Sequence, residues 1–208
     1  MTSGSIVFDA TDDSLINRAN GLDVLRNLSG VTIFIVKKLT NISNSNSQSY
    51  YKTYQASANV RVQIYKRYNS GNNNEASAIR RDDSDTSFLS LNPDDASNVS
   101  KSIVTMWIDY YNKTVKQYLN GTLKRTDTSA VETAWGSETE NSQDTQSWGA
   151  SIGVAHYINP ASPEVDVYVD TAPSDSTIDC VLIVKKALSD EQRQAIENML
   201  LSRYGLAE

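Results

Sequence analysis

Most of the periodic segments in this chain alternate between apolar and polar residues, which is the pattern of half-buried β-strands. Val60, Val62 and Ile64 alternate with polar or amphipathic neighbours. Residues 103–110 have one wholly apolar face and one mixed face. Residues 31–37 form a nearly continuous β-branched and aromatic run, which is typical of a strand covered on both faces. The pattern therefore predicts strands, several of them deeply buried.

Shorter strand-like segments raise the expected number of strands to about ten, separated by turn residues as in a sandwich or barrel. They cover Ser5–Asp9, Ala76–Arg80, Ala150–His156, Val165–Val169 and Ile178–Val184. The sharpest local signal is Asn120-Gly121, placed between Tyr118 and Leu123. This dipeptide suits a type I′ turn, because both central residues of that turn need a positive φ. We therefore expect a tight hairpin at this position.

The end of the chain changes to helical spacing. Ser189 is a candidate N-cap, and Gln192, three residues later, completes a capping box. An apolar stripe follows at helical spacing, formed by Ala195, Ile196, Met199 and Leu200. Gly205 stands where a helix would end, with Leu206 placed to make the accompanying apolar contact. One amphipathic helix is expected over about residues 190–204.

Strands throughout, followed by one late helix, do not fit a parallel βαβ sheet. The sequence predicts an all-β fold, with two antiparallel sheets packed as a sandwich and the helix packed on it. The polar stretches are short and lie between strand-like segments, so we expect residues 1–208 to form a single domain. The expected core residues are Val31, Ile33, Ile35, Val104, Met106, Ile108, Val181 and Ile183, with Leu200 under the helix.

Composition and charge argue against several classes of protein. The chain has 19 Lys and Arg against 25 Asp and Glu, a net charge of −6 without any basic block, so no nucleic-acid partner is expected. The apolar runs are too short for membrane insertion. One Cys and one His exclude an internal disulfide and any site that needs two histidines. The first residues, MTSGSIVFD, lack the regions of a signal peptide.

Several segments, in this order along the chain, carry a family resemblance. Ile6–Asp13 is similar to an opening F-D-G-x-D-D, with Ala10 in place of the glycine. Tyr118–Gly121 is similar to a Y-V-N-G hairpin, and Ile178–Gln192 to I-D-E-V-x-I-Y-x-x-A-L-S-D-x-E. Ala195–Leu206 resembles a closing helix that ends in K-Y-G-L. Together they resemble the LamG-like jelly-roll domains of the concanavalin A-like lectin/glucanase superfamily, of the kind found in bacteriophage structural proteins.

The resemblance implies a jelly roll with two stacked sheets, one of them often concave and used for glycans. It also implies a non-enzymatic structural or adhesive protein of the virion, such as a phage decoration, fibre or tail-associated protein, assembled in the host cytoplasm. Its expected partners are other virion proteins and polysaccharide. A free carbohydrate-binding lectin and a glycoside hydrolase remain as alternatives. Edge strands of a jelly roll can pair with a second copy, so a homo-oligomer is also left open.

The hydrolase alternative rests on one strand-like segment. Glu164, Asp166 and Asp170 alternate on one face, as in the E-x-D-x-x-E strand of the glucanases, with Tyr168 between the last two. Two carboxylates in a glycosidase divide the nucleophile and acid/base roles, which requires environments that separate their pKa values. An ordinary half-exposed strand has the same pattern, so we expect no catalytic residues and no enzyme activity.

Glycan binding needs aromatic faces and polar groups that reach sugar hydroxyls. Trp135 lies among Ser, Thr and Glu in a loop-like segment, and Tyr157 ends a strand-like segment before Asn159-Pro160. These two are the candidate ligand-binding residues. Tyr110 and Tyr111 are further available aromatic side chains, whereas Trp107 is expected at the core or its edge.

Two other features were considered as sites. Asp9, Asp12 and Asp13 could supply oxygen ligands for calcium, although Asp side chains in turns also accept hydrogen bonds from nearby amides. We favour the turn interpretation and expect no cofactor, with calcium as the alternative. Cys180 alternates with Ile178 and Leu182, so it is expected to point into the core as a small apolar side chain.

Overall fold

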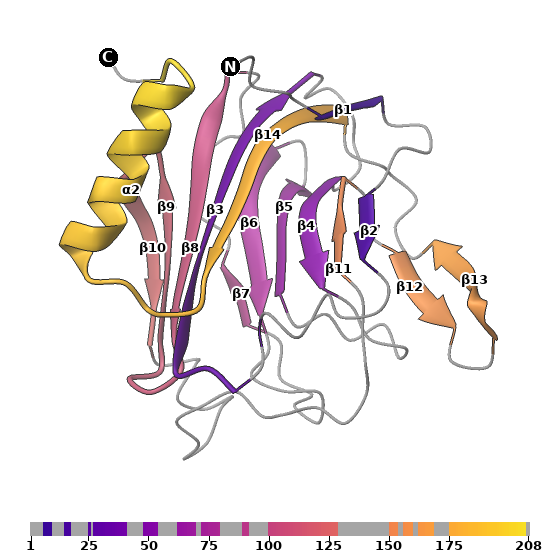
Figure 1. The fold of residues 1–208 in the computed structure, drawn as a ribbon, viewed down its shortest axis with the longest axis horizontal. Helices are drawn as coiled ribbons and strands as arrows, with labels where there is room; N and C mark the ends of the chain where they lie inside the picture. Colours follow the sequence, from indigo (N-terminus) through magenta and orange to yellow (C-terminus); the bar gives the residue numbers. More distant parts are fainter. Residues whose placement is uncertain are drawn as a thin grey trace.

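The computed structural model describes residues 6–9, 15–17, 25, 27–40, 48–53, 62–69, 72–79, 89–91, 100–128, 150–153, 156–159, 162–168 and 175–206. Within these residues the chain forms fourteen strands, all of them paired antiparallel, and the helix α2. Two six-stranded sheets face each other and the helix lies beside one of them (Figure 1). The predicted all-β jelly-roll sandwich with a C-terminal helix is confirmed.

The first sheet, sheet A, carries the helix. Its strands are, in spatial order, β1 (Ile6–Asp9), β14 (Asp175–Val184), β3 (Gly30–Leu39), β8 (Ser102–Asp109), β9 (Thr114–Leu119) and β10 (Thr122–Asp127). The predicted Asn-Gly hairpin joins β9 to β10, and both turn residues have positive φ, 47° at Asn120 and 78° at Gly121. The local turn chemistry therefore fixes the register of these two strands.

The second sheet, sheet B, faces sheet A. Its strands are, in spatial order, β2 (Leu15–Asn17), β11 (Ala150–Ile152), β4 (Gln48–Thr53), β5 (Val62–Asn69), β6 (Asn72–Ile79) and β7 (Leu89–Leu91). The strand-like segment that begins at Ala76 lies in β6, where Ala76–Ile79 pair with Tyr65–Val62 of β5. A separate two-stranded ribbon consists of β12 (His156–Asn159) and β13 (Ser162–Tyr168), at the side of the molecule away from α2 (Figure 1).

The core between the two sheets contains the predicted residues. Val31, Ile33 and Ile35 from β3 are fully buried there, because alternate side chains of a strand point to the same face. The same cluster holds the other predicted core residues, Val104, Met106, Ile108, Val181 and Ile183. Alternation along the sequence therefore identified the inner face of β3 and β8.

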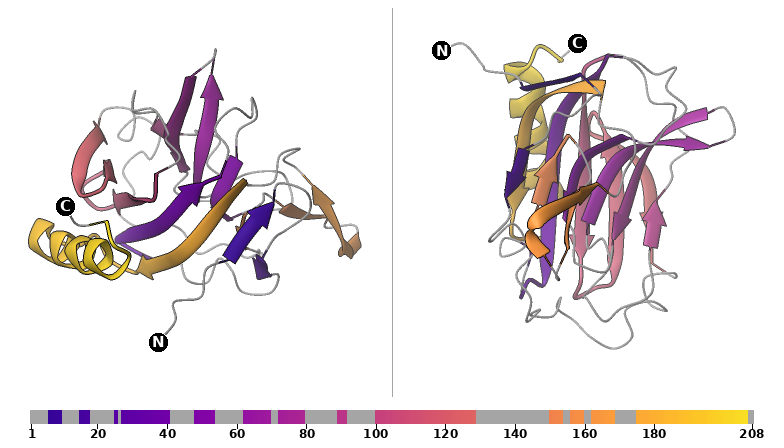
Figure 2. Two further views of the ribbon diagram at one scale, coloured as in Figure 1. Left: turned by 90° about the horizontal axis from the view of Figure 1, so that it is seen from above. Right: turned by 90° about the vertical axis from the view of Figure 1, so that its right-hand side faces the viewer.

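Helix α2 (Asp190–Arg203) packs on the outer face of sheet A, on the side away from sheet B (Figure 2). The predicted capping box is present, with Ser189 as N-cap and Gln192 as its reciprocal partner. The helix ends in a Schellman motif, in which Leu206 N–H donates to Leu201 O at 2.8 Å and Gly205 has a φ of 67°. Within the described residues, no helix is long and apolar enough to cross a membrane.

The buried face of α2 differs from the predicted stripe. Leu200 is buried as expected and Ile196 is half-buried, but Ala195 and Met199 are exposed. Arg193 and Glu197 take their place in the interface and are almost completely buried. The helix is rotated relative to its apolar stripe because this pair of charges, together with Leu200, faces the sheet.

Cys180 also lies on a different face from the predicted one. The β3–β14 register shifts between Ile178 and Cys180, which places a bulge at that point. Ile178 therefore belongs to the core between the sheets, whereas Cys180 is half-buried beneath α2. Burial in this apolar layer raises the pKa of the Cys180 thiol.

Candidate functional site

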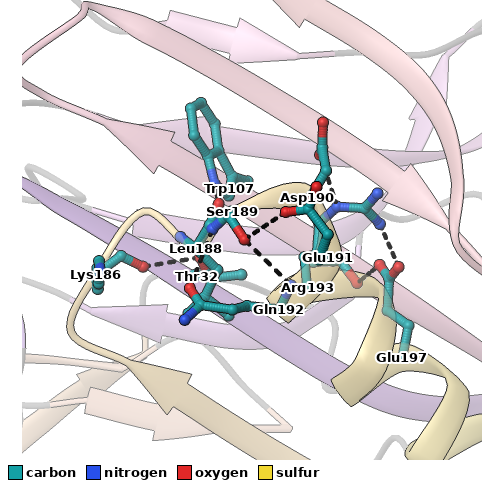
Figure 3. Close-up of polar contacts among 11 residues, drawn as sticks. Thr32, Trp107, Lys186, Leu188, Ser189, Asp190, Glu191, Gln192, Arg193 and Glu197 are labelled. Atoms are coloured by element: carbon teal, nitrogen blue, oxygen red, sulfur yellow. Dashed lines mark hydrogen bonds and ion pairs between the residues drawn. The ribbon is translucent and has the colours of Figure 1, made fainter.

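The outer face of sheet A is closed by the helix and its leading loop. Phe34, Val36 and Ile103 form an apolar layer beneath α2. At the start of the helix, Trp107 Nε1 donates a hydrogen bond to Leu188 O at 2.8 Å, and Thr32 Oγ1 donates to Lys186 O at 2.9 Å (Figure 3). Trp107 is thus held at the edge of the core, as predicted. This part of sheet A cannot receive a ligand without displacing the helix.

At the far edge of sheet A, beyond the helix, there is a shallow hollow of about 510 Å³. It is lined by Val7, Lys38, Leu39, Thr40 and Thr177. The register places Val7, Thr177 and Lys38 side by side on β1, β14 and β3. None of the described lining residues is aromatic, so this part of the wall lacks the ring face expected of a sugar site.

The outer face of sheet B has a different composition. Val62 and Ile64 point into the core, so the alternate residues of β5 point outward. Register places the following described side chains on this outer face: Ser49, Lys52, Gln63, Tyr65, Arg67, Asn74, Ala76, Ala78 and Ser151. They are polar, aromatic or small, and none of them is a carboxylate.

Three residues at one end of this face form a compact group. Tyr65 and Arg67 lie two positions apart on β5, and Asn74 on β6 is directly opposite Arg67. Tyr65 lies opposite Ala76, a small and fully buried residue. All three side chains of the group are half-buried. We call Tyr65, Arg67 and Asn74 the β5–β6 group; it offers a ring face, a guanidinium and an amide on one surface.

A hydrogen bond continues the polar surface across to the next strand. Gln63 Nε2 donates to Ser49 Oγ at 2.6 Å, which links β5 and β4 on the outer face. Ser49 and Lys52 on β4 and Ser151 on β11 are buried. Among the described residues, the polar side chains of this face that are only half-buried therefore lie on β5 and β6.

On the opposite face of the same strands lies a buried ion pair. Lys37 Nζ on β3 is bonded to Glu75 Oε1 on β6, across the gap between the sheets. Both side chains are buried, and the Tyr50 ring lies 5.1 Å from Lys37 Nζ. Glu75 is opposite Lys66 in the β5–β6 register. This cluster joins the two sheets directly behind Arg67 and Asn74, and so helps to fix the strand ends that carry them.

The two predicted ligand-binding residues are not tested by the described part of the chain. Trp135 lies outside the described residues. Tyr157 is on β12 of the separate ribbon, with its backbone opposite Val167. Of the other aromatic candidates, Tyr110 is fully buried and is therefore not a surface contact, whereas Tyr111 is 64% exposed. The roles of Trp135 and Tyr157 stay predictions.

The predicted carboxylate strand is not part of either large sheet. Glu164 and Asp166 are on β13, where Asp166 is opposite Ile158 in the two-stranded ribbon, and Asp170 lies outside the described residues. Asp12 and Asp13 of the calcium alternative also lie outside them. Among the residues that the structure does describe, no three His, Cys, Asp or Glu side chains gather as metal ligands would.

Comparison with known proteins supports the fold. No family model matches the chain, and no curated protein does. Among solved structures, a SAP-like pentraxin from Limulus polyphemus has a TM-score of 0.63 at 11% identity, covering 93% of this chain and 81% of the pentraxin. A Ruminococcus gnavus sialidase module, CBM40, bound to α2,3 sialyllactose has a TM-score of 0.59 at 14% identity, covering 95% of this chain and 100% of the module.

The botulinum neurotoxin serotype D binding domain is a longer chain, and part of it is similar to this chain. It has a TM-score of 0.64 at 14% identity and covers 95% of this chain but 42% of its own. This chain thus spans less than half of the length of that toxin domain. At these identities the likeness establishes architecture alone, and the chain has a lectin-like jelly-roll fold.

Proposed function

We propose that the chain is a non-catalytic, lectin-like module that binds glycans through the outer face of sheet B. The observation that carries this proposal is the contrast between the two outer faces. One is closed by α2, and on the other Tyr65, Arg67 and Asn74 lie half-buried together on adjacent strands. A sugar ring packs its C–H groups on an aromatic face, and guanidinium and amide groups hydrogen-bond its hydroxyls.

The rigidity of the sheet suits such a role. Arg67 and Asn74 are held opposite each other by the β5–β6 ladder, so little backbone entropy is lost when a ligand binds. Similar architectures are compatible with this proposal, because one similar structure is a sialidase module with bound α2,3 sialyllactose. Another is a structure of botulinum neurotoxin type C, a toxin whose cell entry is described as dependent on interaction with two ganglioside molecules.

Replacing Tyr65 by Ala is expected to weaken glycan binding by about tenfold or more, because buried aromatic anchors dominate binding sites. A glycan array followed by calorimetry on the strongest signal measures this loss. Tyr65→Phe keeps the ring and should retain most of the affinity. Tyr111→Ala removes an exposed ring from the β8–β9 turn and serves as the matched control. Equal binding by the Tyr65→Ala and wild-type proteins would contradict the proposal.

The two aromatic residues singled out by the sequence add a second contact in this proposal. Trp135 and Tyr157 would extend the site from the sheet to its rim, since loops on a rigid sandwich vary at low cost to the core. Trp135→Ala and Tyr157→Ala, measured on the same array, separate a rim site from a sheet site: a sheet site loses signal with Tyr65→Ala, and a rim site with these two.

We further propose that this module is carried on a virion as a decoration, fibre or tail-associated protein. The support is the closing segment Arg203-Tyr204-Gly205-Leu206, which resembles the helix end of phage domains and forms a Schellman motif. The acidic surface would keep copies soluble during assembly. Mass spectrometry of purified particles is expected to find the chain at a fixed copy number. Its absence from particles would leave the free lectin.

A further inference from the structure

We infer that the ligand of the sheet B face is an anionic glycan, whose sugar carboxylate is bound by Arg67. This inference rests on the function proposed above and names the class of glycan.

The charge on this face runs opposite to that of the whole chain. The protein has a net charge of −6, yet the described outward side chains of sheet B include Lys52 and Arg67 and no carboxylate. Lys52 is buried, whereas Arg67 is half-buried. Over its described positions, this face of an acidic protein therefore carries cations and no carboxylate. Such a local charge attracts an anion.

Arg67 has no ion pair or hydrogen bond with another described residue. The nearest charged neighbours in sequence and register do not neutralise it, because Lys66 and Glu75 point to the opposite face of the sheet. Glu75 is bonded there to Lys37.

The geometry of the group favours a carboxylate on a sugar. A guanidinium presents a planar fork of N–H donors that matches the two oxygens of a carboxylate. Asn74 directly opposite can hydrogen-bond a neighbouring hydroxyl, and Tyr65, two residues along the same strand, offers a ring face for the sugar itself. One residue for the charge, one for a hydroxyl and one for the ring make a subsite for a carboxylated monosaccharide unit.

The test compares tetragalacturonate with its methyl ester by isothermal titration calorimetry, because the two probes differ in the charge of their carboxyl groups. Wild-type protein is expected to bind the acid at least about tenfold more tightly than the ester, and Arg67→Gln should abolish this preference. Arg67→Lys keeps the charge but loses the fork, so an intermediate preference is expected. Arg125→Gln, an exposed cation on β10, makes the same charge change away from the face and should have no effect.

Each other outcome has a definite meaning. If acid and ester bind equally and Arg67→Gln changes neither, the charge inference is wrong while the proposed glycan binding stands. If neither probe binds and the glycan array is blank, the proposed function itself fails. If a sulfated galactose tetrasaccharide binds as tightly as tetragalacturonate, recognition of a carboxylate is wrong, because a guanidinium then serves only as a point of positive charge.

Discussion

The Glu75→Gln variant is expected to lose about 3–5 kcal/mol of its free energy of unfolding, because the change breaks a buried ion pair. Lys37 Nζ is bonded to Glu75 Oε1 between the sheets, and both side chains are buried. The buried Lys37 ammonium is bonded to this carboxylate in place of water, and a neutral amide cannot compensate its charge. Urea denaturation followed by fluorescence measures the loss.

A double variant separates the ion pair from simple packing. In Lys37→Met/Glu75→Gln the uncompensated ammonium is gone, so most of the lost stability is expected to return. Ser176→Ala, in a buried polar position outside the pair, is the matched single change and should cost less. If Glu75→Gln costs less than about 1 kcal/mol, the pair is not buried as described here.

The Arg193→Met variant is expected to lose about 3–5 kcal/mol at pH 7, because Glu197 is then left as a buried carboxylate without its partner. In the native protein, Arg193 is bonded to Glu197 and stacks on the Tyr118 ring at 3.7 Å, while Thr105 Oγ1 donates to Glu197 Oε1 at 2.7 Å (Figure 3 shows the Arg193–Glu197 pair). Chemical denaturation at neutral pH measures this loss.

The loss should depend on pH in a defined direction. Burial raises the pKa of Glu197 above its ordinary value of 4.5, while the Thr105 hydrogen bond and the Arg193 charge lower it. Removing Arg193 takes away one influence that lowers the pKa of Glu197, so this pKa rises further. The carboxyl in the folded variant then holds its proton to a higher pH than in the unfolded chain. Stability of the variant is then lost as the pH rises from about 4.5 through the raised pKa.

The deficit of Arg193→Met relative to the wild type should therefore be smaller at pH 4.5 than at pH 7. The stability of Arg193→Met/Glu197→Gln, which has no carboxyl to titrate at this position, should fall less between pH 4.5 and pH 7 than that of Arg193→Met. A deficit of Arg193→Met that is unchanged between the two pH values would mean that Glu197 does not carry the effect.

Local signals in the sequence were enough for much of the fold. The Asn120-Gly121 turn, the Ser189 capping box and the inner residues of β3 and β8 were predicted because each depends on residues close together in the chain. The polar strand β4 was missed, since Gln48–Thr53 has few apolar residues and follows an Asn- and Ser-rich stretch. Its burial comes from its neighbours in sheet B, which local periodicity does not record.

Long-range packing accounts for the other differences. The bulge that moves Cys180 under the helix is a property of the β3–β14 pairing. The burial of Arg193 and Glu197 depends on partners on sheet A. The Tyr118 ring stacks on Arg193, and Thr105 donates a hydrogen bond to Glu197. The apolar stripe in the sequence did not indicate that either charge is buried.

The candidate site was the least predictable part. Tyr65, Arg67 and Asn74 become a group only through the β5–β6 register, which the sequence pattern does not record. Their availability also depends on α2 packing against the other sheet. Alternation around Val62 and Ile64 did place Tyr65 on the outer side of a strand, and this was the one signal that could have indicated the group.

The position of β14 has a consequence for the order in which the protein can fold during synthesis. This strand lies between β1 and β3, although more than 130 residues separate it from β3 in the chain. Until the ribosome has released residues 175–184, β3 keeps a long apolar edge without its neighbour, which can pair with other nascent chains. Completion of sheet A must therefore follow translation of nearly the whole chain, and helix docking comes later still.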